Sequence, residues 1–318
     1  MPSVDTDTNA LPARSWRRWV FAIAPAIGVL ELVLHVRQAS SAVPKADWLA
    51  ARDAVLTMAR PDDLVIFAPH WADPLGRSYF GDKVATLARE ARADDTGFAR
   101  AIEVSIRGQH APELATWKSE DVKRVGAITL TTLLNPAPKQ VIDDLLSHEP
   151  LGMRVSRVDL GHEQECAFAR GAAQTGNLGF GPAIPADKFN CAGAFVGISV
   201  IPALDYTARR CFYAPPPGGP PGNGVLRIRF LNVAFGTLLH GHHGIYVEAE
   251  RNREGSPVTL AFKVRDRVLG SVVHTDGDGW KAFELPTTDL AGQADDLVAE
   301  VSTPNGNRRM YCFEADTR

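Results

Sequence analysis

The hydrophobic positions of this chain change their spacing twice, and the changes divide it into three stretches. Residues 19–36 are almost continuously apolar. From residue 47 to 160, segments with helical spacing alternate with short, continuous apolar runs such as 64–69. Beyond residue 198, segments such as 225–230 alternate apolar and polar side chains. The second pattern is typical of an α/β layer with a parallel sheet, and the third is typical of antiparallel strands with one wet face.

The apolar stretch at 19–36 follows three arginines and contains Glu31 and His35. A helix of this length, at about 1.5 Å per residue, would measure roughly 27 Å, close to the hydrocarbon thickness of a bilayer. We expect a transmembrane anchor here, with a cytoplasmic tail at 1–18 because positive charge precedes the stretch. A cleaved signal peptide is the alternative, since residues 40–42 are small.

Both alternatives export the rest of the chain. The anchored form predicts a single-pass protein of the bacterial inner membrane, with most of its residues periplasmic or extracellular. A carboxylate in the middle of a bilayer is costly, so Glu31 predicts a partner helix in a membrane protein; a protonated Glu31 near the interface is the alternative.

Residues 47–160 are predicted to form a small, doubly wound α/β domain. Expected helices lie near 47–60, 82–92, 112–125 and 139–146, and expected strands lie at 64–69, 101–106, 127–134 and 153–160. The first strand is followed by neither a Gly-x-Gly-x-x-Gly motif nor a P-loop, which disfavours nucleotide binding of those kinds.

Ligands of doubly wound sheets bind beyond the carboxyl ends of the strands, which directs attention to the loop at 70–80. This loop contains four candidate ligand-binding residues, His70, Trp71, Asp73 and Arg77. An aromatic ring, an acid and a base together suit a sugar or a phosphate. The alternative is that the aromatic residues cover the sheet while Asp73 pairs with Arg77.

Residues 47–80, with the segment ARPDDLVIFAPHW at 59–71, resemble the soluble extracytoplasmic segment of membrane glycosyltransferases of the dolichyl-phosphate-mannose type. The resemblance covers about 110 residues of the chain and includes neither a multi-span body nor the acidic motif of a first luminal loop. It therefore implies a detached accessory domain with a membrane glycosyltransferase-like partner and without transferase activity.

Residues 161–197 are rich in Gly, Ala and Pro and are interpreted as an irregular linker. The four cysteines all lie in the second half of the chain and include no Cys-x-x-Cys pair, which favours two disulfides over a zinc site in an oxidising compartment. We expect Cys166 to pair with Cys191, pinning the linker, and Cys211 to pair with Cys312.

Residues 198–318 are predicted to form an antiparallel jelly-roll sandwich, which makes the whole chain α/β plus all-β. The segment Gly279-Trp-Lys-Ala-Phe-Glu-Leu-Pro-Thr-Thr-Asp-Leu-Ala-Gly-Gln293, followed by 297–302, resembles galactose-binding-like sandwiches and carbohydrate-binding modules. The resemblance implies a fold and, more weakly, glycan binding.

Two groups of residues are candidates for ligand binding in this part. His243, Tyr246, Glu248 and Trp280 could form a shallow carbohydrate site, with core packing of Trp280 as the alternative. Asp276 and Asp278 could bind calcium, with a tight turn as the alternative.

His240 and His242 stand two residues apart, so on a strand they face the same side. They could share a metal ion with His274 or Asp276 as a third ligand. The alternative is a polar, glycine-flanked turn whose histidines are exposed or bonded to the backbone.

The net charge of −3 and the pI of about 6.3 provide no basic field, so a nucleic-acid partner is not expected. The leading hypothesis is a membrane-anchored accessory protein that binds a glycan or a membrane partner in envelope polysaccharide or lipid-linked sugar metabolism, with no cofactor except possible calcium. A glycan hydrolase or transferase and a structural docking subunit are the alternatives.

Overall fold

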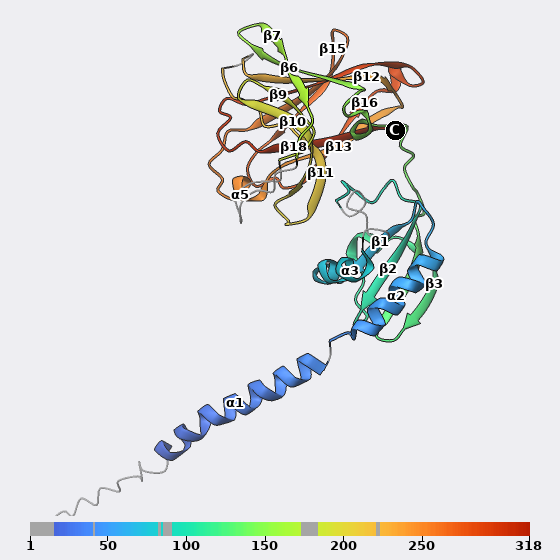
Figure 1. Cartoon of the computed structure of the whole chain (residues 1–318), viewed down its shortest axis with the longest axis vertical. Coiled ribbons are helices and arrows are strands. Elements are labelled where there is room, and N and C mark those ends of the chain that lie inside the picture. Colours follow the sequence, from blue (N-terminus) through green and yellow to red (C-terminus); the bar gives the residue numbers. More distant parts are fainter. Residues whose placement is uncertain (1–15, 41, 82–83, 85–90, 173–183, 221–222) are drawn as a thin grey trace, which may run out of the picture.

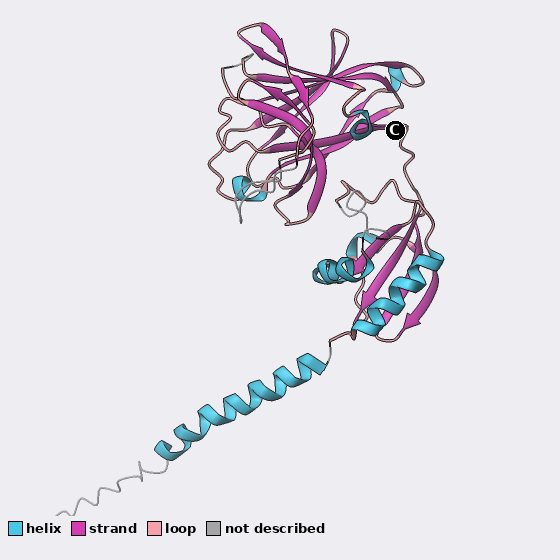
Figure 2. Ribbon diagram, in the orientation of Figure 1, coloured by secondary structure: helices cyan, strands magenta, loops and turns pink. Residues whose placement is uncertain are grey.

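The structure is a computed structural model that describes residues 16–40, 42–81, 84, 91–172, 184–220 and 223–318. Helix α1 (Trp16–Ser40) projects from the rest of the chain (Figure 1). A small mixed sheet with two helices follows it, and a large β-sandwich completes the described part (Figure 2).

The described side chains of α1 cover residues 21–36, about 24 Å of helix, and include Pro25, Glu31 and His35. Among the described residues, no helix is long and apolar enough to cross a membrane. The predicted transmembrane anchor at 19–36 and the single-pass inner-membrane localisation are wrong on this finding. The predicted tail at 1–18 lies largely outside the described residues.

The N-terminal sheet has the strand order β1-β2-β4-β3. Strand β1 (Leu64–Ala68) pairs in parallel with β2 (Arg100–Ile106), whereas β4 (Ile128–Leu134) is antiparallel to both β2 and β3 (Lys118–Val125). Helix α2 (Lys45–Met58) packs on this sheet, and η1 (His70–Ala72) and α3 (Asp73–Phe80) follow β1. The sheet is mixed, so the predicted doubly wound domain is wrong.

The error arises mainly at residues 118–125, which were expected to be helical. Seven of these eight residues are exposed, and the segment is an edge strand whose charged side chains face water. Val125 pairs with Ile128 across a two-residue turn, in which Gly126 has a φ of +58°. This turn chemistry sets the hairpin and overrides the helical spacing.

Two other expected elements also differ. The helix expected at 139–146 forms strand β5 (Asp143–Asp144) and the 3₁₀ turn η3 (Leu145–His148), and another 3₁₀ turn, η2 (Pro112–Leu114), precedes β3. The helix expected at 82–92 lies mostly outside the described residues. The strand expected at 153–160 forms as β6 (Met153–Asp159), but it belongs to the sandwich.

Two antiparallel sheets form the sandwich, as expected from the period-two pattern. One has the order β16-β13-β18-β11-β10-β9-β8 with β5 beside β18, and the other has the order β15-β14-β17-β12-β6-β7. The remaining bounds are β7 (His162–Glu165), β8 (Ala167–Ala169), β9 (Lys188–Cys191), β10 (Ala194–Pro202), β11 (Ala208–Tyr213), β12 (Val225–Ala234), β13 (Leu238–Ile245), α5 (Val247–Glu250), β14 (Val258–Val264), β15 (Arg267–His274), β16 (Lys281–Pro286), η4 (Thr288–Leu290), β17 (Ala294–Ser302) and β18 (Tyr311–Thr317).

The stretch interpreted as a linker at 161–197 therefore contributes strands to both sheets. Both predicted disulfides are confirmed: Cys166 pairs with Cys191, and Cys211 pairs with Cys312.

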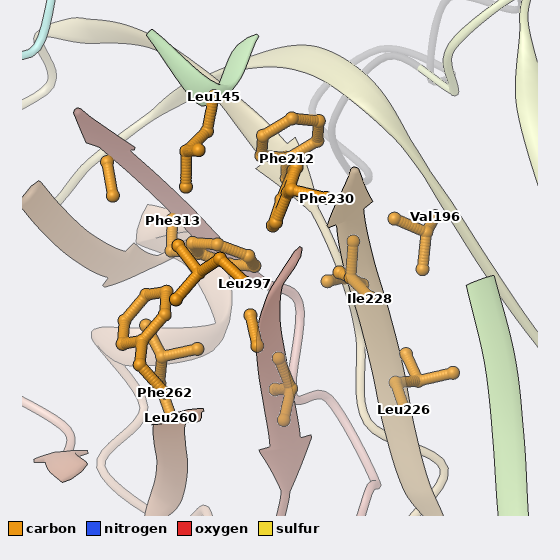
Figure 3. Close-up of a cluster of buried hydrophobic side chains, with 14 of the residues drawn as sticks. Leu145, Val196, Phe212, Leu226, Ile228, Phe230, Leu260, Phe262, Leu297 and Phe313 are labelled. Carbon is orange, nitrogen blue, oxygen red and sulfur yellow. The ribbon is translucent and has the colours of Figure 1, made fainter. Parts of the chain in front are cut away.

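Side chains from both sheets interdigitate in the core of the sandwich (Figure 3). Phe212 and Phe313 from one sheet approach Phe230 and Phe262 from the other, with ring centroids 5.2–6.2 Å apart. Successive residues of a strand alternate between the core and the outer face. The outer face of the eight-stranded sheet consequently carries the polar residues that alternate with the core-facing ones on β13 and β18, although these polar residues are also buried.

Candidate functional site

A cleft of about 610 Å³ lies where the N-terminal unit faces the β10–β11 turn of the sandwich. We call it the aromatic cleft. The residues used below are His70, Trp71, Asp73 and Arg77 on one side, Glu113 beside them, and Asp205, Tyr206 and Arg209 on the other. All four candidates predicted from the loop at 70–80 thus line one cleft, although that segment is helical rather than a loop.

Close packing fixes the predicted segment in place. A Cβ atom at Gly76 would lie 2.2 Å from the Phe67 ring, so only glycine lets α3 approach β1 this closely. Phe67 and Phe80 form an edge-on aromatic pair with centroids 5.0 Å apart, and both contact Trp48 of α2. The position of Trp71, just before α3, is therefore set by a rigid layer.

Two aromatic side chains at the aromatic cleft are open to water. Trp71 is 60% exposed and Tyr206 is 64% exposed. The guanidinium of Arg107 lies 5.6 Å from the Trp71 ring centroid. Tyr206 has a φ of +61° in its turn, where glycine or asparagine would cost less. The sheet-covering alternative therefore does not describe Trp71.

Asp73 and Asp205 in the aromatic cleft are held in ion pairs. Asp73 pairs with Arg77 one turn later on α3, and Asp205 lies 3.1 Å from Arg209. Arg209 also donates to the backbone oxygens of Arg92 and Ala93, at 3.1 Å each, and so ties the sandwich to the loop at 91–98. These fixed charges can form hydrogen bonds to hydroxyl groups.

The loop at 91–98 then crosses the outer face of the eight-stranded sheet. Arg210 donates its backbone N–H to Ala91 at 2.6 Å, and Arg318 donates to the Thr96 hydroxyl at 2.8 Å. A second hollow of about 640 Å³, the acidic crevice, opens beside it. Its acidic lining residues are Asp62, Asp94, Asp144, Glu314 and Asp316, and its basic lining residues are Arg92, Arg210 and Arg318.

Burial shapes the ionisation of the crevice acids. It raises the pKa of Glu314 well above its usual value, and the charge of Asp316 raises it further. Burial also acts to raise the pKa of Asp94, but the hydrogen bond from Thr96 and the charge of Arg318 bring it below its usual value. Burial lowers the pKa of His242, against the opposing charge of Asp94.

One group of described side chains has the donor set of a metal site. Single ligand atoms of Asp94, His240 and His242 all lie within 4.8 Å of one another. The predicted pairing of His240 with His242 is thus present, but the third residue is Asp94. His274 lies elsewhere, with its Nε2 atom 3.1 Å from Glu250, and Asp276 pairs with Arg309.

The candidates predicted for a shallow site on the sandwich are not brought together. His243 is buried, its Nδ1 atom lies 2.9 Å from the Tyr311 hydroxyl, and burial lowers its pKa to about 3. Tyr246 is 7% exposed, and Glu248 pairs with Arg251 at 2.8 Å.

The other three sandwich candidates also have partners. Trp280 is half-buried, donates to the backbone oxygen of Ala93 at 3.2 Å and stacks on His242. Asp276 lies 2.6 Å from the buried Arg309, and Asp278 lies 3.1 Å from Lys281. Calcium at this turn stays a prediction.

Sequence reasoning missed Asp94, Tyr206, Glu314 and Asp316. The last two share a signal, because acids two residues apart on the final strand face the same side, as His240 and His242 do on β13. The Asp205-Tyr206 turn follows a strand and presents an aromatic side chain, which is also visible in the sequence. Nothing in the sequence joins Asp94 to β13.

No family model and no curated protein match the chain. Among solved structures, it is similar to a Clostridium perfringens ZmpB fragment containing CBM51-2 with GlcNAc and INT domains, at 13% identity and a TM-score of 0.30, covering 62% of this chain and 45% of that one. A ZmpB fragment with the M60 catalytic domain and two CBM51 domains has 11% identity and a TM-score of 0.29, covering 64% and 20%.

An isomalto-dextranase of Arthrobacter globiformis T6 complexed with panose has 9% identity and a TM-score of 0.23, covering 61% and 25%. This chain spans less than half the length of the Clostridium chains. Likenesses this low do not assign the chain to any class of protein. The β-sandwich rests on the strand pairing itself, and the glycosyltransferase resemblance has no support in these comparisons.

Proposed function

We propose that the protein binds a glycan in the aromatic cleft. The observation that carries the proposal is the pair of exposed rings, Trp71 and Tyr206, at a cleft whose walls also hold charged hydrogen-bonding groups. The flat face of an aromatic ring suits the C–H face of a sugar, and burying it against a ligand removes apolar surface from water.

The charged residues supply the polar half of such a site. Asp73 and Asp205 each have an arginine partner, so their oxygens are held in place and remain acceptors for hydroxyl groups. Glu113 is exposed at the same cleft. Carboxylates locked to arginines suit recognition better than proton transfer, which favours a binding protein over a hydrolase.

A glycan array and titration calorimetry on the full chain test the proposal. Trp71→Ala and Tyr206→Ala should each weaken binding by about 5- to 30-fold, because loss of one stacked ring removes roughly 1–2 kcal/mol. Leu151→Ala is the matched control, since Leu151 is 86% exposed and does not line the aromatic cleft.

A folded chain that binds no glycan on the array would overturn the proposal, as would binding that both ring variants retain. The narrower hypotheses, a membrane glycosyltransferase-like partner and a role in envelope polysaccharide metabolism, stay predictions, because no contact in the aromatic cleft selects them.

A further inference from the structure

The side chains of Asp94, His240 and His242 form a small polar cluster on the outer face of the eight-stranded sheet, apart from the aromatic cleft. The two imidazole rings project from the same face of β13, with centroids 5.0 Å apart. Asp94 reaches them from the loop at 91–98, and its Oδ2 atom lies 3.6 Å from Nε2 of His240. The side chains of both histidines are 9% exposed and that of Asp94 is 20% exposed, so the cluster is largely shielded from water.

Carboxylates on the neighbouring strand face the imidazoles from the other side. In the β13–β18 register, His242 pairs with Glu314 and His240 pairs with Asp316. Nδ1 of His242 lies 2.8 Å from Oε1 of Glu314, and Nδ1 of His240 lies 3.9 Å from Oδ2 of Asp316. A carboxylate at one ring nitrogen orients an imidazole so that the other nitrogen can bind a metal ion.

One nitrogen of the cluster lacks a hydrogen bond. Nδ1 of His240 is buried, and no described residue gives it a hydrogen-bond partner. Buried polar atoms are almost always bonded, so the described residues around His240 do not satisfy its ring. Nδ1 faces Asp316 at 3.9 Å, whereas Nε2 is the ring atom near Asp94 and the one that would bind a cation.

We propose that Asp94, His240 and His242 bind a divalent transition-metal ion such as Zn²⁺. Two imidazole nitrogens and one carboxylate oxygen form a three-ligand set for this class of ion, with a fourth position left to water or another ligand. Calcium and magnesium prefer all-oxygen sites, so the two imidazoles disfavour them.

The positions of the ligands imply that the ion would have a structural role. Two ligands come from β13 and one comes from the loop at 91–98, which precedes β13 by more than a hundred residues. A bound ion would therefore clamp this loop to the sheet. Asp94 also lines the acidic crevice, where an oxygen donor could take the fourth position.

Metal titration of the full chain tests the proposal without reference to any glycan. After treatment with EDTA and its removal, we expect calorimetry with ZnCl₂ to give one ion per chain with micromolar or tighter affinity. Asp94→Asn, His240→Gln and His242→Gln should each weaken it at least thirtyfold, because each removes one of three ligands. His162→Gln and Asp121→Asn are matched controls, since both residues are exposed and lie outside the cluster, on β7 and β3.

Cobalt provides a second measurement on the same site. Co²⁺ should bind with the visible absorption of a four- or five-coordinate complex, and each ligand variant should lose it. Absence of one-to-one binding in the folded wild-type chain would overturn the proposal, and so would affinity that survives all three ligand substitutions. Circular dichroism of metal-free Asp94→Asn, whose change lies on a loop, separates lost binding from lost folding.

Discussion

The two faces of the eight-stranded sheet both carry histidine side chains, but these side chains have different surroundings and different roles. On β13, His243 points into the sandwich, bonds the Tyr311 hydroxyl and has a pKa lowered to about 3 by burial. His242, one residue earlier, points outward and lies 2.8 Å from Glu314. A step of one residue along a strand exchanges the faces, so the inner imidazole is a neutral packing element while the outer one is placed for chemistry. Stability and binding should therefore respond to different substitutions.

The largest effect should come from the covalent link on the outer face. Cys211 and Cys312 lie 101 residues apart in the chain, so opening their disulfide frees a long loop in the unfolded state. The chain-entropy model gives a loss of about 4.7 kcal/mol in the free energy of unfolding for the Cys211→Ser, Cys312→Ser double variant. Urea unfolding measures it.

The second disulfide is the internal control. Cys166 and Cys191 are separated by 25 residues, for which the same model gives roughly 3.5 kcal/mol. If opening the short loop cost more than opening the long one, loop closure would not be the main source of stability at these bridges.

The second-largest loss in the free energy of unfolding should come from a substitution on the apolar inner face. Phe313 is fully buried between Phe212 and Phe262, so Phe313→Ala removes its contacts with both sheets and leaves a cavity. We expect a loss of about 4 kcal/mol in the free energy of unfolding, measured in urea at neutral pH. Leu160→Ala, at a side chain that is 78% exposed, should change it by less than about 0.5 kcal/mol. A loss below about 1 kcal/mol for Phe313→Ala would contradict the inner-face assignment.

The third-largest loss in the free energy of unfolding should come from substitution of a buried carboxylate beside the inner histidines. Oε1 of Glu250 accepts backbone N–H groups from Gly277 at 3.2 Å and Gly279 at 2.7 Å, and lies 3.1 Å from His274 Nε2. Glu250→Ala should cost about 3 kcal/mol, because the donors stay buried without an acceptor. Glu250→Gln keeps one oxygen there and should cost less than half as much; equal losses would show that these hydrogen bonds do not matter.

The sequence predicts which side chains of a sandwich strand are buried better than it predicts which distant segments come into contact. Alternation at 225–230 indicates a half-buried strand, and β12 has that pattern of burial. The cysteines could be paired because each pair joins strands or their connections. At 118–125, however, charged residues on an edge strand mimic a helical face, and only the turn at Gly126 distinguishes the two. Asp94 reaches His240 across 146 positions through tertiary packing alone, which no local pattern encodes.

A substitution at the outer histidine, His242, should give the smallest change in the free energy of unfolding. Its comparison with a substitution at His243 is the most direct test of the two faces. His242→Gln keeps an N–H that can donate to Glu314 and loses the stacking on Trp280, so the metal-free chain should lose only about 1 kcal/mol. His243→Ala, the neighbouring change, leaves a cavity and an unbonded Tyr311 hydroxyl, and it should cost about 2–3 kcal/mol. The losses in zinc affinity should follow the opposite order to the losses in stability, since His242→Gln removes a ligand and His243→Ala does not. Parallel urea and zinc titrations of the two variants decide the matter: if both measurements ranked them in the same order, the two faces would not divide stability from binding.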